Sequence, residues 1–354
     1  MKFYQILEIA GNQQHAGTKA VEDISTIATN LGYHTINVIM RNTNEGKIAK
    51  IQRQIGYYKD WNKIYKTIEE NSIVLLQHPF HYPQLTRERI LKKLKKEKNI
   101  KFISLIHDVE ELRQFRYNNY YKSEFKFMIE MANVFVVHNK VMADFFVERG
   151  IAKEKIVILE IFDYLQKINT SKRIIFNKTL NIAGNLDMEK CGYLKELFDL
   201  KTININLFGP NFTWGIENNS NIHYKGSYPT DEIPNQLNEG FGLVWDGDSI
   251  NGCIGKSGQY LKYNNPHKLS LYLSSGLPVV IWDGAAEAEF VKKYNVGICV
   301  ESLYELDMIF DSLTKEKYQE LLNNVNDVSK KLIKGFYGEK ALKEARNVIE
   351  RKNI

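Results

Sequence analysis

A cluster of ionisable residues directly follows an apolar run in the first half of the chain. Residues 101–106 read Lys-Phe-Ile-Ser-Leu-Ile, and His107, Asp108, Glu110 and Arg113 come next. A carboxylate at the end of a buried strand can accept the proton of a substrate hydroxyl, with an arginine as its charge partner. We take Asp108 as the candidate general base, aided by His107. The structural alternative is that Asp108 caps the next helix and the glutamates occupy its first turn.

A lysine stands at the start of an expected helix in the second half. Before it, Asn264 or Asn265 suits a helix cap and Pro266 suits the first turn. Lys268 follows within that turn, where a cation is unfavourable unless an anion lies nearby. This pattern indicates a diphosphate, and we place Asn265 and Lys268 in a nucleotide-sugar site.

Two glycine-containing turns follow expected strands. The first runs from Gly11 to Thr18 and leads into a helix, and the second contains Gly184 and Asn185. Glycine allows a backbone to approach a ligand closely, and a helix N-terminus favours phosphate. Neither turn has the spacing of a dinucleotide-binding or Walker motif. We assign Gly11, Gly184 and Asn185 to nucleotide-sugar binding; for the first turn the alternative is an ordinary strand-to-helix turn.

Two patterns resemble metal ligands, but we expect no metal at either. Asp246 and Asp248 form an Asp-x-Asp pattern, which holds a metal-bound diphosphate in some sugar transferases. We interpret it as a polar turn after a strand. His78 and His81 lack a third ligand nearby, so lining an acceptor pocket is the favoured role for them.

The elements that must position these residues are alternating strands and helices. In the first half, apolar runs such as 3–10, 72–79 and 100–108 are separated by amphipathic segments. Continuous apolar runs are typical of parallel strands buried on both faces. The rhythm restarts after a polar stretch. We therefore expect an α/β protein with Rossmann-like domains at 1–165 and 166–330, and a helical tail at 331–354 that may return to the first domain.

Composition excludes several classes of protein. With 354 residues, only 3 Cys and 7 Pro, the chain is neither a disulfide scaffold nor a Pro-rich linker protein. It shows no secretory leader and no apolar stretch near ~20 residues, so we expect a cytoplasmic protein. The net charge of +6 is concentrated between Thr86 and Lys101. A solvated helix face is the default interpretation; docking on the anionic inner face of the membrane is the alternative. Nucleic acid binding is disfavoured.

Several longer stretches resemble one family of enzymes. The run 245–291, together with LIHDVEELR (105–113), EIFDYL (160–165) and GNLDMEKC (184–191), closely resembles bacterial β-1,6-galactofuranosyltransferases of polysaccharide biosynthesis. The wider group includes glucosyltransferases that act on serine-rich adhesins. It is similar at NPHKLSLYLSSGLP (265–278) and at the first glycine-containing loop. The resemblance extends over most of the chain.

The resemblance implies a GT-B fold, in which two Rossmann-like domains face each other across a cleft. It implies a UDP-sugar donor held mainly by the second domain, an acceptor held by the first, inversion, and no obligatory metal or other cofactor. Lys268 matches the lysine that contacts the donor diphosphate, Thr18 a threonine facing the nucleotide, and Tyr228 a donor-site tyrosine. Met188 stands where relatives have an arginine, with Lys190 close by, and the paired glutamates of retaining enzymes are absent.

The sequence thus predicts a metal-independent, inverting glycosyltransferase that moves a hexose, galactofuranose being favoured, from a UDP-sugar to a glycan acceptor. Two alternatives remain: a UDP-glucose-dependent transferase that modifies a glycoprotein, and a non-catalytic subunit that binds sugar nucleotides. A lipid-linked acceptor, peripheral membrane contact and homo-oligomerisation are left open.

Overall fold

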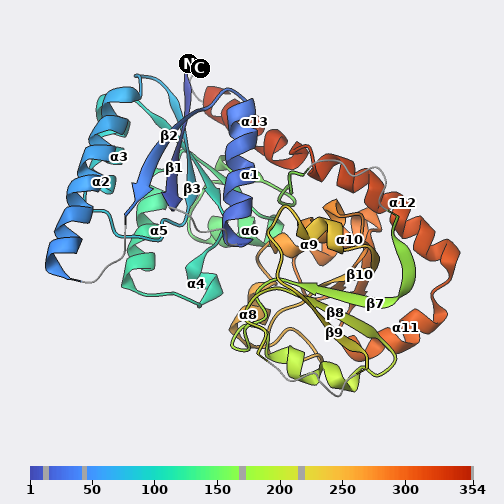
Figure 1. The fold of residues 1–354 in the computed structure, drawn as a ribbon. Helices are drawn as coiled ribbons and strands as arrows, with labels where there is room; N and C mark the ends of the chain where they lie inside the picture. Colours follow the sequence, from blue (N-terminus) through green and yellow to red (C-terminus); the bar gives the residue numbers. More distant parts are fainter. Residues whose placement is uncertain (11–15, 42–45, 167–172, 214–219, 352–354) are drawn as a thin grey trace. The chain divides into compact units, whose positions relative to one another are not determined.

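The chain forms two α/β units. The computed structural model describes residues 1–10, 16–41, 46–166, 173–213 and 220–351. The first unit contains Met1–Leu159 together with the segment from Gly338, and the second contains Glu160–Tyr337 (Figure 1). The division falls near the boundary expected after residue 165, and the C-terminal segment groups with the first unit.

The first unit is built on a parallel sheet with the strand order β2-β1-β3-β4-β5-β6. Its strands are β1 (Phe3–Ala10), β2 (His34–Met40), β3 (Ile73–His78), β4 (Lys101–Ile106), β5 (Val134–Val137) and β6 (Ile156–Ile158). Its helices are α1 (Ala16–Asn30), α2 (Lys47–Thr67), α3 (Arg87–Glu97), α4 (Glu110–Arg113), α5 (Asn119–Met131), α6 (Lys140–Glu148), the 3-10 turn Lys153–Lys155 and most of α13 (Phe336–Arg351). The central strands β3, β4 and β5 are almost wholly buried, as their apolar runs predict.

The helix α13 packs on the first strands of this unit. The guanidinium of Arg346 donates to the Tyr33 hydroxyl at 3.1 Å and to the Leu31 carbonyl at 2.8 Å. It also lies 3.8 Å from the centroid of the Phe3 ring. Helix α13 therefore contacts β1 and the turn between α1 and β2.

The second unit contains a parallel sheet in the order β12-β11-β10-β7-β8-β9. Its strands are β7 (Ile175–Ala183), β8 (Asn204–Phe208), β9 (Ile222–Gly226), β10 (Glu239–Val244), β11 (Val279–Trp282) and β12 (Gly297–Val300). Its helices are α7 (Ile233–Gln236), α8 (Gly255–Tyr260), α9 (His267–Ser274), α10 (Ala288–Tyr294), α11 (Leu306–Ser312), α12 (Lys315–Leu332) and the 3-10 segments Gly192–Asp199 and Leu303–Glu305.

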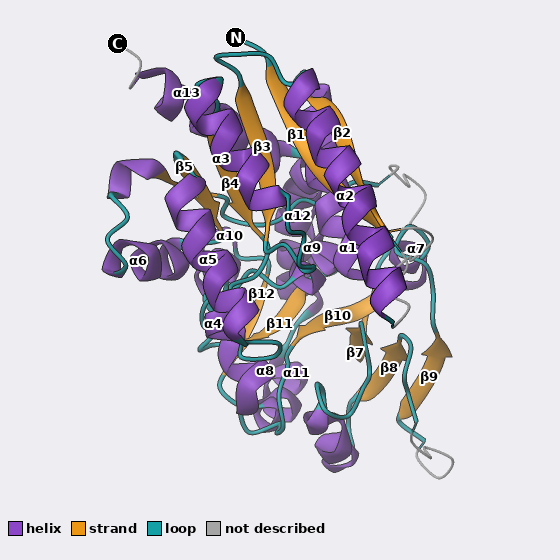
Figure 2. Cartoon of the chain, turned by 90° about the vertical axis from the view of Figure 1, so that its left-hand side faces the viewer, coloured by secondary structure: helices purple, strands orange, loops and turns teal. Residues whose placement is uncertain are grey.

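The strand orders place the candidate residues at special points of both sheets. Figure 2 shows the strands of each unit lying together with helices packed around them. In open parallel sheets, ligands bind beyond the carboxyl ends of the strands where the strand order reverses. In the first unit that point lies between β1 and β3, and in the second between β7 and β10. The residues that follow these four strands are therefore the ones to inspect.

Candidate functional site

Lys268 is a buried cation at the carboxyl end of β10. From the first turn of α9, its Nζ donates to the Trp245 carbonyl at 2.8 Å and pairs with Asp246 Oδ1 at 3.0 Å. The two side chains of the ion pair are only 13% and 10% exposed. Burial lowers the pKa of Lys268, but the Asp246 carboxylate and the nearby Cys191 and Tyr272 raise it more, so the pKa lies above its ordinary value. The lysine is charged and held in place.

The start of α9 differs from the sequence prediction. Pro266 is the N-cap residue and not part of the first turn, and no side chain caps the helix there. The expected asparagine caps are wrong. The Asn265 amide donates to the Glu160 carbonyl at 2.9 Å, and Asn264 Oδ1 is buried with no hydrogen-bond partner among the described residues.

A tyrosine one turn further along α9 ties this helix to the sheet. Tyr272 is fully buried, and its hydroxyl accepts the Ala183 N–H at 2.7 Å. Burial, above all, raises the pKa of Tyr272 to about 12, so the hydroxyl stays neutral. A Cβ on Gly242 would lie 2.0 Å from the tyrosine ring, so only glycine fits there. Tyr272 fixes the position of Lys268 relative to the end of β7, a role that the sequence analysis missed.

The turn after β7 is a close backbone approach. Gly184 has a φ of +142°, and its carbonyl would lie 1.7 Å from a Cβ placed on Gly209. The exposed Asn185 orders this turn, because its Oδ1 accepts from the Asp187 N–H at 3.1 Å and from Asn211 at 2.8 Å. These contacts describe a glycine-dependent turn at the switch point of the second sheet; that it binds a ligand stays a prediction.

A buried thiol joins the turn to the lysine. Cys191 Sγ donates to the Asn185 carbonyl at 3.3 Å and lies 3.9 Å from Asp246 Oδ1. Burial raises the pKa of this thiol to about 11, so it is an unreactive packing group. Asn185, Cys191, Asp246 and Lys268 thus form one connected set, in which Asn185 and Lys268 are predicted donor-site residues.

The two carboxylates of the Asp-x-Asp pattern have different environments. Asp246 forms an ion pair with Lys268, whereas Asp248 lies against two glycines. A Cβ on Gly255 would come within 2.1 Å of Asp248 Oδ2, and one on Gly192 within 3.1 Å of its Oδ1. Within the described ranges of the chain, no three His, Cys, Asp or Glu side chains gather as metal ligands. That the protein needs no metal stays a prediction.

Three predicted donor-site residues are not placed with this set. Tyr228 follows β9, is partly buried, and lies 6.3 Å from the Phe208 ring. Thr18 falls within α1, and its side chain lies outside what the structure describes, as does Gly11. Their assignment to the nucleotide-sugar site therefore stays a prediction.

A cavity elsewhere in the second unit is not part of this site. It measures about 1230 Å³ and is lined by Ile175, Gly276, Lys315 and Lys334, among others. Ile175 is the first residue of β7, so the cavity lies at the amino edge of the sheet, opposite the carboxyl ends. We do not assign it to the donor.

In the first unit, Asp108 is a partly exposed carboxylate paired with Arg113. Asp108 Oδ2 lies 2.9 Å from Arg113 Nη1, and its side chain is 26% exposed. Glu110 is 2% exposed, pairs with the same arginine at 3.1 Å, and accepts the Arg116 N–H at 2.9 Å. The N-cap of α4 is Val109, which makes no side-chain cap bond. The Asp108 side chain is therefore partly exposed, whereas that of Glu110 is buried.

His107 is held against the neighbouring strand. Its Nε2 lies 2.6 Å from Gln77 Oε1, and its backbone N–H donates to the His78 carbonyl at 2.7 Å. These bonds place His107 and Asp108 at the carboxyl ends of β3 and β4, the edge at which ligands bind. The structure thus brings both predicted catalytic residues to one edge of the first sheet.

The expected pocket role of His78 is wrong. His78 is 2% exposed, and its Nδ1 lies 2.7 Å from Glu124 Oε1, which also accepts the Phe80 N–H at 3.1 Å. Its side chain is therefore occupied within the fold. His81 is exposed, with its Nδ1 3.1 Å from the Tyr121 hydroxyl. Although the residue is exposed at the surface, the protein around its ring displaces water and, with Arg116, lowers the pKa of His81.

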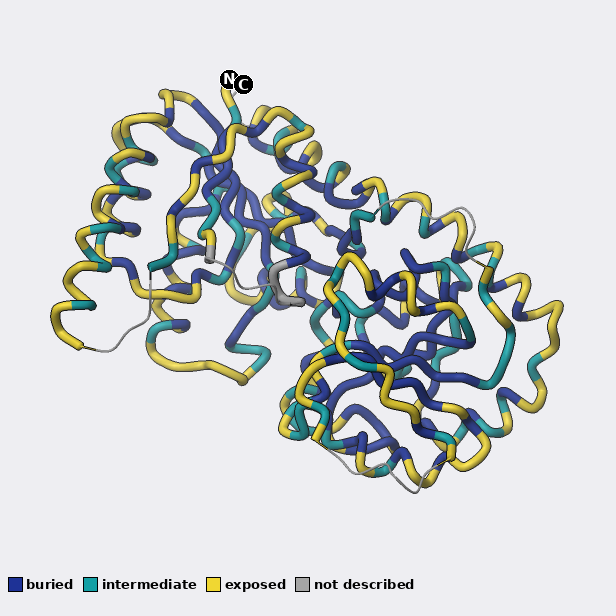
Figure 3. The backbone as a smooth tube through the Cα atoms, viewed as in Figure 1, coloured by how far each residue is buried: buried dark blue, intermediate teal, exposed yellow. Residues whose placement is uncertain are grey.

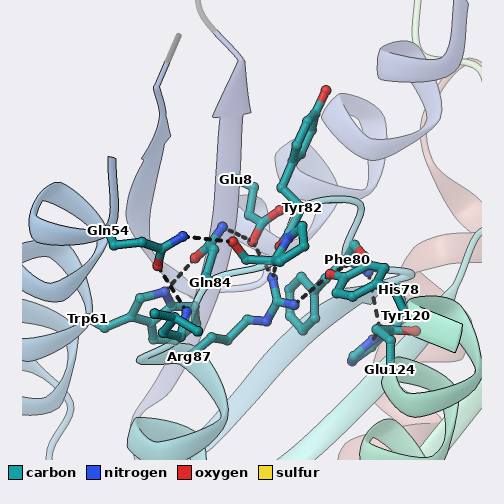
Figure 4. A network of polar contacts seen from close by, with 12 residues as sticks. Glu8, Gln54, Trp61, His78, Phe80, Tyr82, Gln84, Arg87, Tyr120 and Glu124 are labelled. Carbon is teal, nitrogen blue, oxygen red and sulfur yellow. Dashed lines mark hydrogen bonds and ion pairs between the residues drawn. The ribbon is translucent and has the colours of Figure 1, made fainter. Parts of the chain in front are cut away.

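A polar network that the sequence analysis did not find lies beside this loop (Figure 4). Arg87, 3% exposed, pairs with Glu8 at 3.0 Å, donates to the Tyr120 hydroxyl at 2.8 Å, and stacks 4.2 Å from the Phe80 ring centroid. Gln84 donates to Glu8 at 2.6 Å. Burial raises the pKa of Glu8, outweighing the opposing effect of Arg87. The network fixes the loop between β3 and α3 relative to the end of β1.

Comparison with known proteins places the chain in a family. Models of the glucosyltransferase 3-like N-terminal and C-terminal domains match residues 4–161 and 180–345. The β-1,6-galactofuranosyltransferase WbbI of Escherichia coli is 31% identical over 346 residues, 96% of this chain and 97% of the relative. The chain belongs to the glucosyltransferase 3-like family. Glucosyltransferase 3 of Streptococcus gordonii is 25% identical over 92% of both chains. The expected resemblance is confirmed, and the protein is a glycosyltransferase.

Solved structures with low sequence identity show the same fold. The lipopolysaccharide outer core galactosyltransferase WaaB superimposes with a TM-score of 0.59 at 13% identity, covering 98% of this chain and 99% of its own. Anabaena HepE, solved in complex with UDP and glucose, gives 0.59 at 10% identity and covers 99% of both chains. The prediction of a GT-B fold with two Rossmann-like domains is confirmed.

Proposed function

We propose that this glycosyltransferase moves a hexose from a UDP-sugar to a glycan acceptor, with galactofuranose as the hexose and a β-linkage formed by inversion. The 31% identity to WbbI over almost the whole of both chains carries the choice of sugar and linkage. The complex of HepE with UDP and glucose supports a UDP-sugar donor. No metal or other cofactor takes part in the proposed reaction.

The set around Lys268 supports a diphosphate site. A buried lysine that is already charged and positioned needs little reorganisation to stabilise the negative charge that develops on a leaving diphosphate. Its partners, Asp246 and the Trp245 carbonyl, hold it at the switch point of the second sheet. The glycine turn at Gly184 allows a ligand to approach the backbone there.

Asp108 is the proposed base. Its side chain is partly exposed, and it lies at the carboxyl edge of the first sheet beside His107. In the proposed inverting displacement, Asp108 takes the acceptor hydroxyl proton as that oxygen attacks the anomeric carbon and the bond to UDP breaks. Arg113 orients the carboxylate through the 2.9 Å ion pair.

The 25% identity to glucosyltransferase 3 favours a second candidate, transfer of glucose from UDP-glucose to a glycoprotein. The test is to incubate the protein with UDP-galactofuranose, UDP-galactopyranose or UDP-glucose, with and without acceptor glycans, and to measure UDP release. The proposal predicts release with UDP-galactofuranose and a β-anomeric product by NMR. Release with UDP-glucose alone supports the second candidate. UDP binding without turnover of any donor supports a non-catalytic subunit.

A further inference from the structure

Helix α2 presents an apolar stripe to solvent. Ile48, Ile51, Ile55 and Tyr58 are 74%, 61%, 52% and 54% exposed. Their spacing of three and four residues places them on one side of the helix. The opposite side packs into the fold through Tyr57, Trp61 and Ile64, which are buried. The N-terminal turns of α2 are accordingly exposed in Figure 3. Soluble helices seldom leave four such side chains uncovered together.

A neighbouring loop extends the stripe. Leu85 is 80% exposed, and its backbone N–H donates to Gln54 Oε1 on α2 at 3.0 Å. Gln54 Nε2 donates in turn to the Pro83 carbonyl at 3.1 Å, as Figure 4 shows. These two bonds hold Leu85 beside α2. The apolar patch, defined as Ile48, Ile51, Ile55, Tyr58 and Leu85, therefore has a fixed backbone.

Exposed lysines of α2 surround the apolar patch. The sequence of α2 contains six basic residues and one acid. The exposed lysines of α2 are Lys47, Lys50, Lys59, Lys63 and Lys66. Its single acid, Asp60, is neutralised by Arg41 at 2.7 Å. Lys47 and Lys59 lie four residues from Ile51 and Ile55, so they flank the stripe directly.

The basic helix α3, for which membrane docking was the alternative to a solvated face, has much of its charge occupied within the fold. Arg87 is buried with Glu8. Lys95 donates to the Glu130 and Met131 carbonyls at 2.7 and 2.9 Å, and Lys98 to the Tyr65 and Ile68 carbonyls at 2.6 and 2.7 Å. These lysines complete the C-terminal ends of α5 and α2. These contacts favour α2 over α3 as the candidate docking helix.

We propose that the apolar patch and its lysines dock the protein on the surface of an anionic lipid bilayer. Apolar side chains flanked by lysines are the pattern of helices that lie in a membrane interface. A second copy of the chain is a poorer occupant, because a two-fold contact would bring the same unneutralised lysines together. Anionic headgroups complement those lysines. This inference is independent of the sugar and linkage proposed above.

Flotation of the full-length protein with vesicles tests the proposal. Phosphatidylcholine vesicles with phosphatidylglycerol should carry the protein, and pure phosphatidylcholine vesicles should not. Ile51→Ser/Ile55→Ser should lower the partition coefficient at least about tenfold, because two exposed isoleucines lose their apolar contact with lipid. Lys47→Gln and Lys59→Gln should each lower it about fivefold, and added salt should weaken binding.

Controls distinguish the outcomes. Met308→Ser removes an equally exposed apolar side chain, 72% exposed, from the second unit and should leave flotation unchanged. Melting temperatures should match the parent, because every substituted side chain is exposed. Flotation that ignores phosphatidylglycerol, or that Ile51→Ser/Ile55→Ser leaves intact, overturns the proposal. So does an absence of flotation combined with a fall in solution mass in that variant, which identifies a second copy as the occupant.

Discussion

Replacing Lys268 separates its role in the fold from its role in binding UDP. The ion pair with Asp246 is 13% and 10% exposed, so removing the cation in Lys268→Met leaves a buried carboxylate without its partner. Breaking a buried pair in this way costs about 3–5 kcal/mol of stability. The same variant loses a charge-assisted hydrogen bond to the proposed diphosphate. At ~1.5–3 kcal/mol, that loss raises the Kd for UDP about 10- to 100-fold.

The double variant Lys268→Met/Asp246→Asn provides the control. With the carboxylate gone, no charge is stranded, and most of the lost stability should return. UDP affinity should not return, because the cation is still missing. Asp246→Asn alone should retain UDP binding. Thermal unfolding reports the first quantity and titration calorimetry with UDP the second. A folded double variant that binds UDP like the parent would refute the assignment of Lys268 to the diphosphate.

The remaining predictions concern three residues. Asp108→Asn should lower single-turnover transfer by ~10²–10⁴-fold while UDP affinity and melting temperature stay unchanged; a near-normal rate would remove Asp108 from the reaction. Tyr272→Phe leaves the Ala183 N–H unpaired in the core, so it should cost about 1–3 kcal/mol in denaturant unfolding and also weaken UDP binding. An unchanged midpoint would contradict that role. Burial lowers the pKa of His138 to about 4, while its Nε2 lies 3.0 Å from the Ile106 carbonyl. Because the unfolded chain takes up this proton at higher pH, stability should fall by about 3 kcal/mol as pH drops from about 6.5 to 4. His138→Gln should lack that part of the slope, which parallel urea titrations of the two proteins measure.

The sequence predicted the elements whose signal is local. Continuous apolar runs identified β3, β4 and β10, because these strands are buried on both faces. The edge strand β9 was missed, since His223, Tyr224 and Lys225 are exposed and the segment reads as polar. The pattern of 188–200 favours a helix, and within it Gly192–Asp199 forms a 3-10 helix.

The site residues likewise divide into those that a local sequence pattern predicts and those that depend on long-range contacts. Asp108 and Lys268 stand beside an apolar run and a helix start, so sequence order alone pointed to them. The pairing of Glu8 with Arg87 spans 79 positions, and no local pattern reports such a contact. His78 looked accessible beside a proline, yet Glu124, 46 residues later, engages it in the interior. Long-range partners decide which polar residues are buried, and one sequence without structure does not supply them.

The grouping of α13 with the first unit makes that unit discontinuous along the chain. During synthesis, its six strands leave the ribosome first, yet Arg346 cannot cover Phe3 and Tyr33 until the whole second unit has been made. Domains usually fold in the order in which they emerge. All of the second unit is therefore synthesised before α13 can pack on the first unit. A chain stopped after Tyr337 would contain the whole second unit but would leave Phe3 and Tyr33 of the first unit uncovered. Complete packing of the first unit therefore depends on α13.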